Sequence, residues 1–214
     1  AGVVGSNGGQ PAIRSLVDEA DLIFYIGCRA GSVTTERWRS PKAGTTVVHM
    51  DNDPAVIGAC YQTKAAMVCD ARLGLEALIL ELGAVFGKNG TVRVLAAKTE
   101  KWKAFAPLAV SNKMPIKPER VLADLAKHLP DDAVVCADPG TPCPYFSAWF
   151  EWPKPGRYFI TNRAHGALGF AIGASIGAQS GRPNAKVICA AGEGSFGTSA
   201  GEPETLQRLN VPNT

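Results

Sequence analysis

A glycine turn between a buried strand and a helix start restricts the fold of this chain more than any other segment. The apolar run 186–191 predicts a buried parallel strand. Gly192-Glu193-Gly194-Ser195 follows it, and then a helix start with Ser199 as the expected cap and Glu202 as its capping-box partner. A strand, a glycine turn and a helix N-terminus bring backbone N–H groups together around an anion. The acidic side chain of Glu193 inside the turn predicts a divalent cation between protein and phosphate.

The composition is that of a folded α/β protein rather than a disordered or membrane-spanning one. Apolar residues make up 46% of the 214 positions and charged residues 19%, which allows a sizeable buried core. The formal net charge of +3 is too small to indicate nucleic acid or a membrane surface as a partner. No run of about 18 apolar residues is present, so we expect no transmembrane helix.

The cysteines do not follow a metal or redox pattern. The chain has 6 cysteines, with neither a C-x-x-C pair nor zinc-site spacing. Four of them lie in or beside apolar strand-like runs, where a thiol acts as a small hydrophobic side chain: Cys28, Cys69, Cys136 and Cys189. We therefore expect structural cysteines in a reducing compartment, the cytoplasm.

Strand and helix patterns alternate in the first part of the chain, which predicts the α/β class with three layers and a mostly parallel sheet. Buried strands are expected at 22–27 and 46–50, and a helix over 71–82 has apolar residues at helical spacing. The pattern weakens after residue 87, where we expect only a short helix near 101–105 and a linker at 111–115.

A second three-layer α/β segment with a mostly parallel sheet is predicted after the linker. A helix is expected from about residue 117, strands at 133–137 and 158–160, and a helix rich in small residues over 166–179. The expected domains are therefore residues 1–112 and 113–214. Both look truncated, because the chain opens in the middle of a pattern and stops where another strand should follow.

Three loops of the second segment follow the expected carboxyl ends of strands, where open α/β sheets bind ligands. These loops contain Asp138, Asn162 and Gly192. We therefore expect them to converge on one ligand. Taken singly, each acidic or basic residue also has an ordinary interpretation: Asp138 as a turn residue, and His165 as a surface histidine before a helix.

The ordered motifs of the second segment are Ala137-Asp138-Pro139-Gly140, Gly166-Ala167-Leu168-Gly169-Phe170 and Gly192-Glu193-Gly194-Ser195-Phe196. Together they resemble the diphosphate-binding domain of thiamine-diphosphate enzymes, in particular of the acetolactate synthase group. Residues 26–29 and 49–58 are similar to the middle domain of that group, which often carries a flavin or an adenine nucleotide. The resemblance covers nearly the whole chain, and its motifs are specific as an ordered set.

The resemblance implies roles for these residues. Glu193 would bind Mg²⁺, Gly166 would offer its carbonyl oxygen to the aminopyrimidine, and Leu168 would be the bulky side chain that bends the cofactor. The diphosphate of thiamine diphosphate would be lined by Gly140, Thr141, Gly192, Gly194 and Ser195.

Three residues of the first segment are further candidates for a nucleotide site. Arg29 would contact a phosphate of FAD or another adenine nucleotide, and Asp51 and Asp70 would contact ribose or adenine. The alternative for Arg29 and Asp51 is a salt bridge at a strand end.

The chain departs from the family pattern at the metal site. The family has Asp where this chain has Glu193. The extra methylene moves the carboxylate outward by about one bond length, whereas Mg²⁺ requires near-octahedral ligands at about 2.0–2.1 Å. Either the loop readjusts or metal binding weakens. The second metal ligand of the family and its activating glutamate would lie outside this chain, so these residues alone are expected to be inactive.

The implied activity is decarboxylation of a 2-oxo acid and transfer of a two-carbon unit to an acceptor by a homodimer or homotetramer. No nucleic-acid or membrane partner is expected. Two alternatives stay open: a nucleotide-binding module without catalysis, and a structural or decaying remnant of the same fold. The first is weakened because residues 5–9 do not form a G-x-G-x-x-G fingerprint.

Overall fold

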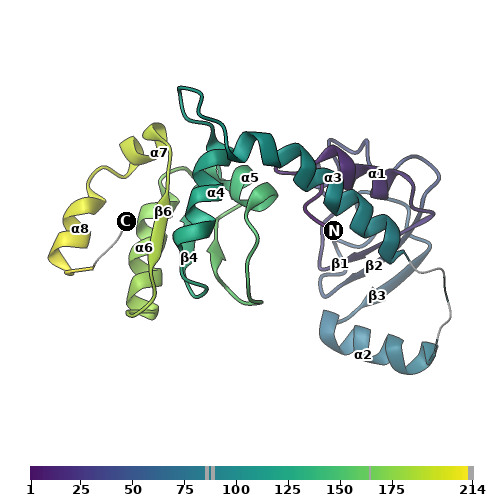
Figure 1. Ribbon diagram of the computed structural model, residues 1–214. Helices are drawn as coiled ribbons and strands as arrows, with labels where there is room; N and C mark the ends of the chain where they lie inside the picture. The colour runs from purple at the N-terminus through teal and green to yellow at the C-terminus, as the bar shows by residue number, and fades with distance from the viewer. Residues whose placement is uncertain (85–86, 88–89, 164, 212–214) are drawn as a thin grey trace. The chain divides into compact units, whose positions relative to one another are not determined.

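Two parallel sheets organise the chain in this computed structural model, which describes residues 1–84, 87, 90–163 and 165–211. Contacts divide the chain into unit 1, Ala1–Trp102, and unit 2, Lys103–Thr214. Among the described residues, unit 1 holds a 3-stranded parallel sheet in the order β1-β2-β3, and unit 2 holds one in the order β5-β4-β6. The predicted α/β class with parallel sheets is confirmed (Figure 1).

Unit 1 contains the helices α1 (Pro11–Asp18) and α2 (Ala71–Leu82) and the strands β1 (Leu22–Ile26), β2 (Thr46–Asp51) and β3 (Ala65–Val68). The strands predicted at 22–27 and 46–50 and the helix over 71–82 are confirmed within a residue. The strand β3 was not predicted, because a run of four residues containing two alanines carries little strand signal. In Figure 1, α1 lies above and α2 below the three strands.

Gly74 lets α2 pack closely on the sheet of unit 1. It is the buried residue of α2, whose other residues are exposed or half-buried. A methyl group on its Cα would lie 2.5 Å from Cys69 Sγ and 2.9 Å from Met50 Sδ. Neither neighbour can move freely, because Met50 is 0% exposed and Cys69 directly follows β3.

Gly74→Ala is therefore expected to destabilise unit 1 by about 1–3 kcal/mol through overpacking. The gain of about 1 kcal/mol in helix propensity offsets part of this cost, so the net destabilisation should be up to about 2 kcal/mol. The matched control is Gly173→Ala in α6 (Phe170–Gly181), where no atom lies within 4 Å of the added methyl group. That control is expected to stabilise unit 2 by about 0.5–1 kcal/mol. Urea unfolding followed by circular dichroism measures both; equal stabilisation would contradict the close packing.

The helix α3 (Thr91–Ala109) runs across the division between the units, where the sequence predicted only a short helix near 101–105. Its apolar residues do not form one buried stripe: Val92 and Leu95 are 76% and 56% exposed, whereas Ala97 is buried. The periodicity that predicts an amphipathic helix is therefore absent from most of its length.

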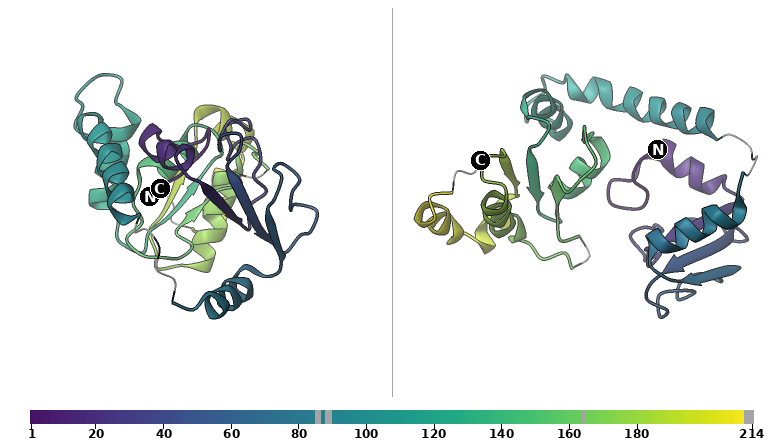
Figure 2. Two further views of the ribbon diagram at one scale, coloured as in Figure 1. Left: turned by 90° about the vertical axis from the view of Figure 1, so that its right-hand side faces the viewer. Right: turned by 90° about the horizontal axis from the view of Figure 1, so that it is seen from below.

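Unit 2 places helices on both faces of its sheet, which makes three layers. In β4, alternate side chains point to opposite faces. Val135 and Ala137 pack with Leu122 and Phe146 on one face, whereas Val134 and Cys136 pack with α6 on the other. Figures 1 and 2 show α6 alongside β4 and β6. The remaining elements of unit 2 are α4 (Pro118–His128), β4 (Val134–Ala137), α5 (Pro142–Trp149), β5 (Phe159–Ile160), β6 (Val187–Ala190), α7 (Glu193–Thr198) and α8 (Glu202–Arg208).

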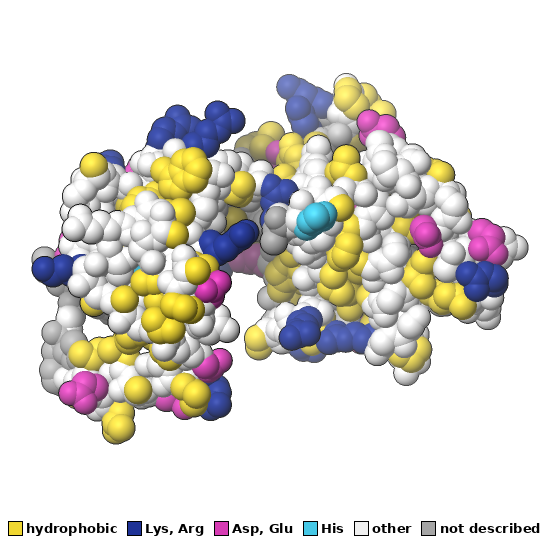
Figure 3. Space-filling model, turned by 180° about the vertical axis from the view of Figure 1, so that it is seen from behind, with side chains coloured by type: hydrophobic (Ala, Val, Ile, Leu, Met, Phe, Trp, Pro, Cys, Tyr) yellow, Lys and Arg dark blue, Asp and Glu magenta, His cyan; other side chains and the backbone are white. Residues whose placement is uncertain are grey.

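Exposed apolar side chains gather over β3 and α2 of unit 1 (Figure 3). They are Val68, Leu73, Ile79, Leu80 and Leu82.

None of the helices in the described ranges combines the length and the apolar character needed to cross a bilayer.

Candidate cofactor-binding site

The three predicted loops leave the same edge of the unit 2 sheet. Parallel pairing of β5, β4 and β6 places their carboxyl ends together. The loops therefore begin side by side at Asp138, Thr161 and Ala191. The prediction that they converge is supported by direct contacts between the first two loops and by a contact between the start of α6 and the residue that follows α7.

The first contact joins the Asp138 loop to the segment before α6. Asp138 is 0% exposed, and its Oδ2 and Oδ1 atoms accept hydrogen bonds from the backbone N–H groups of Gly169 (3.0 Å) and Ala171 (2.8 Å). The Asp138 N–H donates to the Ala190 carbonyl oxygen at 3.0 Å. Asp138 is therefore not a solvent-exposed turn residue: it caps α6 and ties the carboxyl ends of β4 and β6 to that helix.

The second contact joins the α6 start to the end of α7. Ser199 Oγ donates to the Gly169 carbonyl oxygen at 3.0 Å. The predicted capping box of Ser199 and Glu202 is wrong, because Gly201 is the N-cap of α8. The glycine turn leads directly into the short helix α7, so Ser199 follows a helix instead of starting one. This long-range role could not be read from the local spacing.

The glycine turn presents Glu193 to solvent at the start of α7. Glu193 is exposed, and its carboxylate has no hydrogen bond or ion pair with the described part of the chain. Gly192 and Gly194 have no atom within 4 Å of the position that a side chain would occupy, whereas Ser195 is buried. Glu193 also lines a cavity of about 450 Å³ with residues of α6, β6, α7 and α8. A ligand can therefore reach both the carboxylate and the adjacent backbone.

Leu168 and Gly140 lie together on the neighbouring loops. A methyl group on Gly140 would be 3.7 Å from Leu168 Cδ2. Leu168 is 53% exposed, so its side chain is accessible to a ligand at this edge. Gly166 adopts a left-handed φ of 79° and is exposed, and Thr141 is exposed at the start of α5. The structure thus brings Leu168 to Gly140, while no hydrogen bond among the described residues joins Gly166 or Thr141 to the Glu193 turn.

The loop after β5 contains two buried polar side-chain atoms. Thr161 Oγ1 and Asn162 Oδ1 are buried without a hydrogen-bond partner among the described residues. The Asn162 amide donates to the Ala167 carbonyl oxygen at 3.0 Å, and Arg163 Nη1 donates to the Pro139 carbonyl oxygen at 2.5 Å. The Asn162 bond closes the second loop on itself, and the Arg163 bond holds that loop against the first. Neither bond was predicted from the sequence. His165 is exposed.

The thiols near this edge are not nucleophiles. Burial, followed by the neighbouring Cys189 thiol, raises the pKa of Cys136 to about 12. Burial also raises the pKa of Cys189, although a hydrogen bond with Ser175 opposes that shift. Both thiols are therefore protonated at neutral pH. Within the described ranges no group of three or more His, Cys, Asp or Glu side chains could hold a metal ion.

The nucleotide candidates of unit 1 share the carboxyl edge of their sheet, but two have structural partners. Asp51 Oδ1 accepts from the Asp53 N–H at 3.0 Å. Asp70 caps α2 by accepting from the N–H groups of Arg72 and Leu73 at 3.0 and 3.1 Å. Arg29 is exposed and has no ion pair with a described residue. The salt-bridge alternative is therefore not seen for Arg29 or Asp51.

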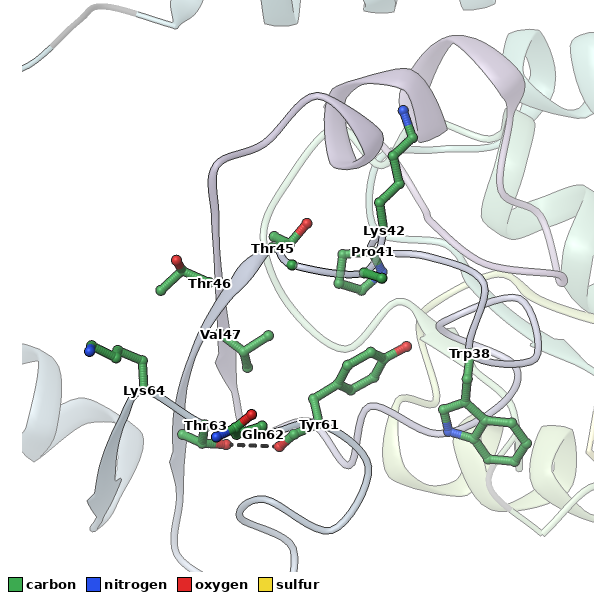
Figure 4. A pocket seen from close by; sticks show the side chains of 12 residues that line it. Trp38, Pro41, Lys42, Thr45, Thr46, Val47, Tyr61, Gln62, Thr63 and Lys64 are labelled. Carbon is green, nitrogen blue, oxygen red and sulfur yellow. Dashed lines mark hydrogen bonds between the residues drawn. The ribbon is translucent and has the colours of Figure 1, made fainter.

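A cavity of about 600 Å³ in unit 1 does not coincide with these candidates. It lies at the amino ends of β2 and β3, where Lys42, Thr46 and Lys64 are among its lining residues. Figure 4 shows the ammonium groups of the two lysines pointing away from each other. Two cations that diverge do not make a phosphate site, so we assign no function to this cavity.

Comparison with known proteins identifies the class. Residues 1–78 match the central domain of thiamine pyrophosphate enzymes, and residues 138–214 match their C-terminal TPP binding domain. This chain belongs to the thiamine pyrophosphate enzyme family.

Within that family, the chain is similar to several acetolactate synthase large subunits. The chain is 28% identical over 224 residues to the probable large subunit of Methanococcus aeolicus, covering 99% of this chain and 37% of that protein. It is 30% identical over 219 residues to the probable acetolactate synthase large subunit of Methanocaldococcus jannaschii, covering 99% of this chain and 36% of that protein. It is 28% identical over 214 residues to the acetolactate synthase isozyme 3 large subunit of Escherichia coli, covering 99% of this chain and 37% of that protein. The chain thus spans little more than a third of the length of these relatives.

Proposed function

We propose that the full-length protein is a thiamine-diphosphate-dependent enzyme of the acetolactate synthase type. It would decarboxylate a 2-oxo acid and transfer the remaining two-carbon unit to an acceptor. The observation that carries this proposal is the edge of the β5-β4-β6 sheet, where Glu193 in an open glycine turn shares one edge with the Leu168 loop. We assign residues 1–112 to the middle domain and residues 113–214 to the diphosphate-binding domain.

The described residues fit a diphosphate and one metal ion shared with it. Gly166, Gly192 and Gly194 leave open space where side chains would project, so phosphate oxygens can approach the backbone. Glu193 is an exposed carboxylate without a partner in the described ranges, so both of its oxygens are available to a metal ion. Because it is a single acid, Mg²⁺ would need the diphosphate oxygens and other parts of the protein to complete its ligands.

Each residue of the site then has a defined task. Glu193 holds the ion, Gly192, Gly194 and Ser195 surround the diphosphate, and Gly140 and Thr141 line its other side. Leu168 bends the cofactor and shields it from water, while Gly166 offers its carbonyl oxygen to the aminopyrimidine. When bound, thiamine diphosphate would supply the electron sink that the loss of CO₂ from a 2-oxo acid requires.

We also propose that the protein is a cytoplasmic homodimer or homotetramer. Leu168 and Phe196 are 53% and 50% exposed on either side of the site, and a second subunit would cover such apolar side chains. In unit 1, Arg29 is the residue we propose for a phosphate of FAD or another adenine nucleotide. It is exposed at the carboxyl edge of the sheet, and its guanidinium has no ion pair within the described ranges.

Calorimetry of the full-length protein with thiamine diphosphate tests the proposal. We expect binding in the presence of Mg²⁺ and little binding when EDTA removes the ion. Thiamine without its diphosphate is the control ligand and should bind weakly. At 100 times the dissociation constant, the cofactor should stabilise the fold by about 2.7 kcal/mol. If the cofactor neither binds nor raises the melting temperature, the proposed enzyme function is refuted. The two alternatives are then a nucleotide-binding module without catalysis and a remnant of the same fold.

A further inference from the structure

Asp138 is a buried carboxylate for which the proposed function has no role. Its two oxygens accept from Gly169 and Ala171, and its own N–H donates to Ala190 of β6. A fully buried acid is costly unless it is hydrogen-bonded, and here the N-terminus of the 12-residue helix α6 compensates for it. Asp138 thus fixes the first turn of α6 relative to the carboxyl ends of β4 and β6.

Gly169 is held from its other side as well. Ser199 Oγ donates to its carbonyl oxygen at 3.0 Å, and Thr198 Oγ1 donates to the Ser195 carbonyl oxygen at 2.7 Å. Gly169 has a φ of 85°, and a methyl group there would overlap the hydroxyl oxygens of Thr198 and Ser199. The backbone at Gly169 is therefore clamped between β4 and the end of α7, the helix that begins with Glu193.

Leu168 directly precedes this clamp. Because its side chain is 53% exposed and packs only partly, its direction depends mainly on the backbone beside it. Its Cδ2 atom lies against Gly140, two residues after Asp138. A movement of Gly169 would therefore move Leu168 relative to Glu193, while the core of unit 2 stayed packed.

We propose that Asp138 is a positioning residue that sets Leu168 relative to the Glu193 turn, with Ser199 as its counterpart on the other side of Gly169. This inference rests on the proposed function, in which Leu168 bends the cofactor and Glu193 holds its metal ion. Asp138 acts through the backbone of Gly169 and does not itself contact the cofactor.

Asp138→Asn in the full-length protein tests this inference. The amide keeps the shape of the side chain, but its NH₂ group faces an N–H donor, so one of the two hydrogen bonds to Gly169 and Ala171 is lost. We expect the dissociation constant for thiamine diphosphate with Mg²⁺ to rise by about tenfold. Hydrogen exchange at the two amides should accelerate. The matched control is Asp124→Asn on α4, which removes an exposed ion pair with Arg120 and should change binding less than twofold.

A double-mutant cycle that combines Asp138→Asn with Leu168→Ala distinguishes two roles of Asp138. In one it positions Leu168 for the cofactor, and in the other it only caps α6. If Asp138 acts through Leu168, Asp138→Asn should weaken binding by less than about twofold in the Leu168→Ala background. Additive losses in the two backgrounds, or unchanged affinity of Asp138→Asn, would overturn the inference.

If Asp138→Asn does not fold, Ser199→Ala replaces it as the test. This substitution removes the hydrogen bond from the Ser199 hydroxyl to the Gly169 carbonyl oxygen and so loosens the same glycine. The same coupling to Leu168→Ala is expected, and additivity would again overturn the inference. A wild-type protein that binds no thiamine diphosphate is a distinct result, since it refutes the proposed function on which this inference depends.

Discussion

Glu193→Ala is expected to abolish metal-dependent binding of thiamine diphosphate while unit 2 stays folded. The carboxylate is exposed and has no partner among the described residues, so the fold does not depend on it. Removing even an outer-shell partner of a metal costs about 10–100-fold in affinity, and the loss of a direct ligand should reach at least about 100-fold. Calorimetry of the full-length protein at saturating Mg²⁺ measures this loss, and circular dichroism checks the fold.

Two variants control for charge and for side-chain length. Glu204→Ala removes another exposed acid, one that pairs with Arg208 on α8, and should leave cofactor binding within about twofold. Glu193→Asp keeps the carboxylate and shortens its reach by one methylene, so we expect binding to persist. If Glu193→Ala binds the cofactor as tightly as the wild-type protein does, the role assigned to Glu193 is refuted.

Phe146→Ala is expected to cost the most stability, about 3–5 kcal/mol in unit 2. Phe146 is 4% exposed, and its ring centroid lies 5.6 Å from that of Phe150 and 6.1 Å from that of Phe159. The ring also packs against Val135 and Ala137, so its removal opens a cavity between α5 and the sheet. With a urea dependence of about 1–3 kcal/mol per molar, the unfolding midpoint of unit 2 should fall by roughly 2 M.

The matched control is Phe196→Ala, since Phe196 is 50% exposed. That substitution should cost about 1 kcal/mol or less. Equal losses for the two variants would mean that Phe146 does not anchor the core of unit 2.

The central strands and the glycine turn could be predicted from the sequence because their signals are local. An apolar run of four to six residues followed by glycine or aspartate identified β1, β2, β4 and β6. The same signals predicted only residues 101–105 of α3, because its apolar residues are spread around the helix. They gave no prediction of β3, which is too short and too rich in alanine. It also missed α7, because glycines at two of six helical positions argue against a helix.

The residues of the candidate site were predicted from the sequence, but the hydrogen bonds that connect its loops were not. The loops containing Asp138, Asn162 and Gly192 were placed correctly at strand ends, since parallel strands present their carboxyl ends at one edge. Asp138 and Ser199, however, were given local roles in turns and caps. Their partners lie 31 and 30 residues away at Gly169.

The order of residues alone thus established a parallel α/β chain with an acidic glycine turn, because strand, turn and acid lie within ten consecutive positions. Which side chains meet across the loops depended on the folded chain. The strand order β5-β4-β6 places β4 beside β6 and brings the start of α6 between Asp138 and Ser199. No local pattern records that order, because it is the packing of whole elements that selects it.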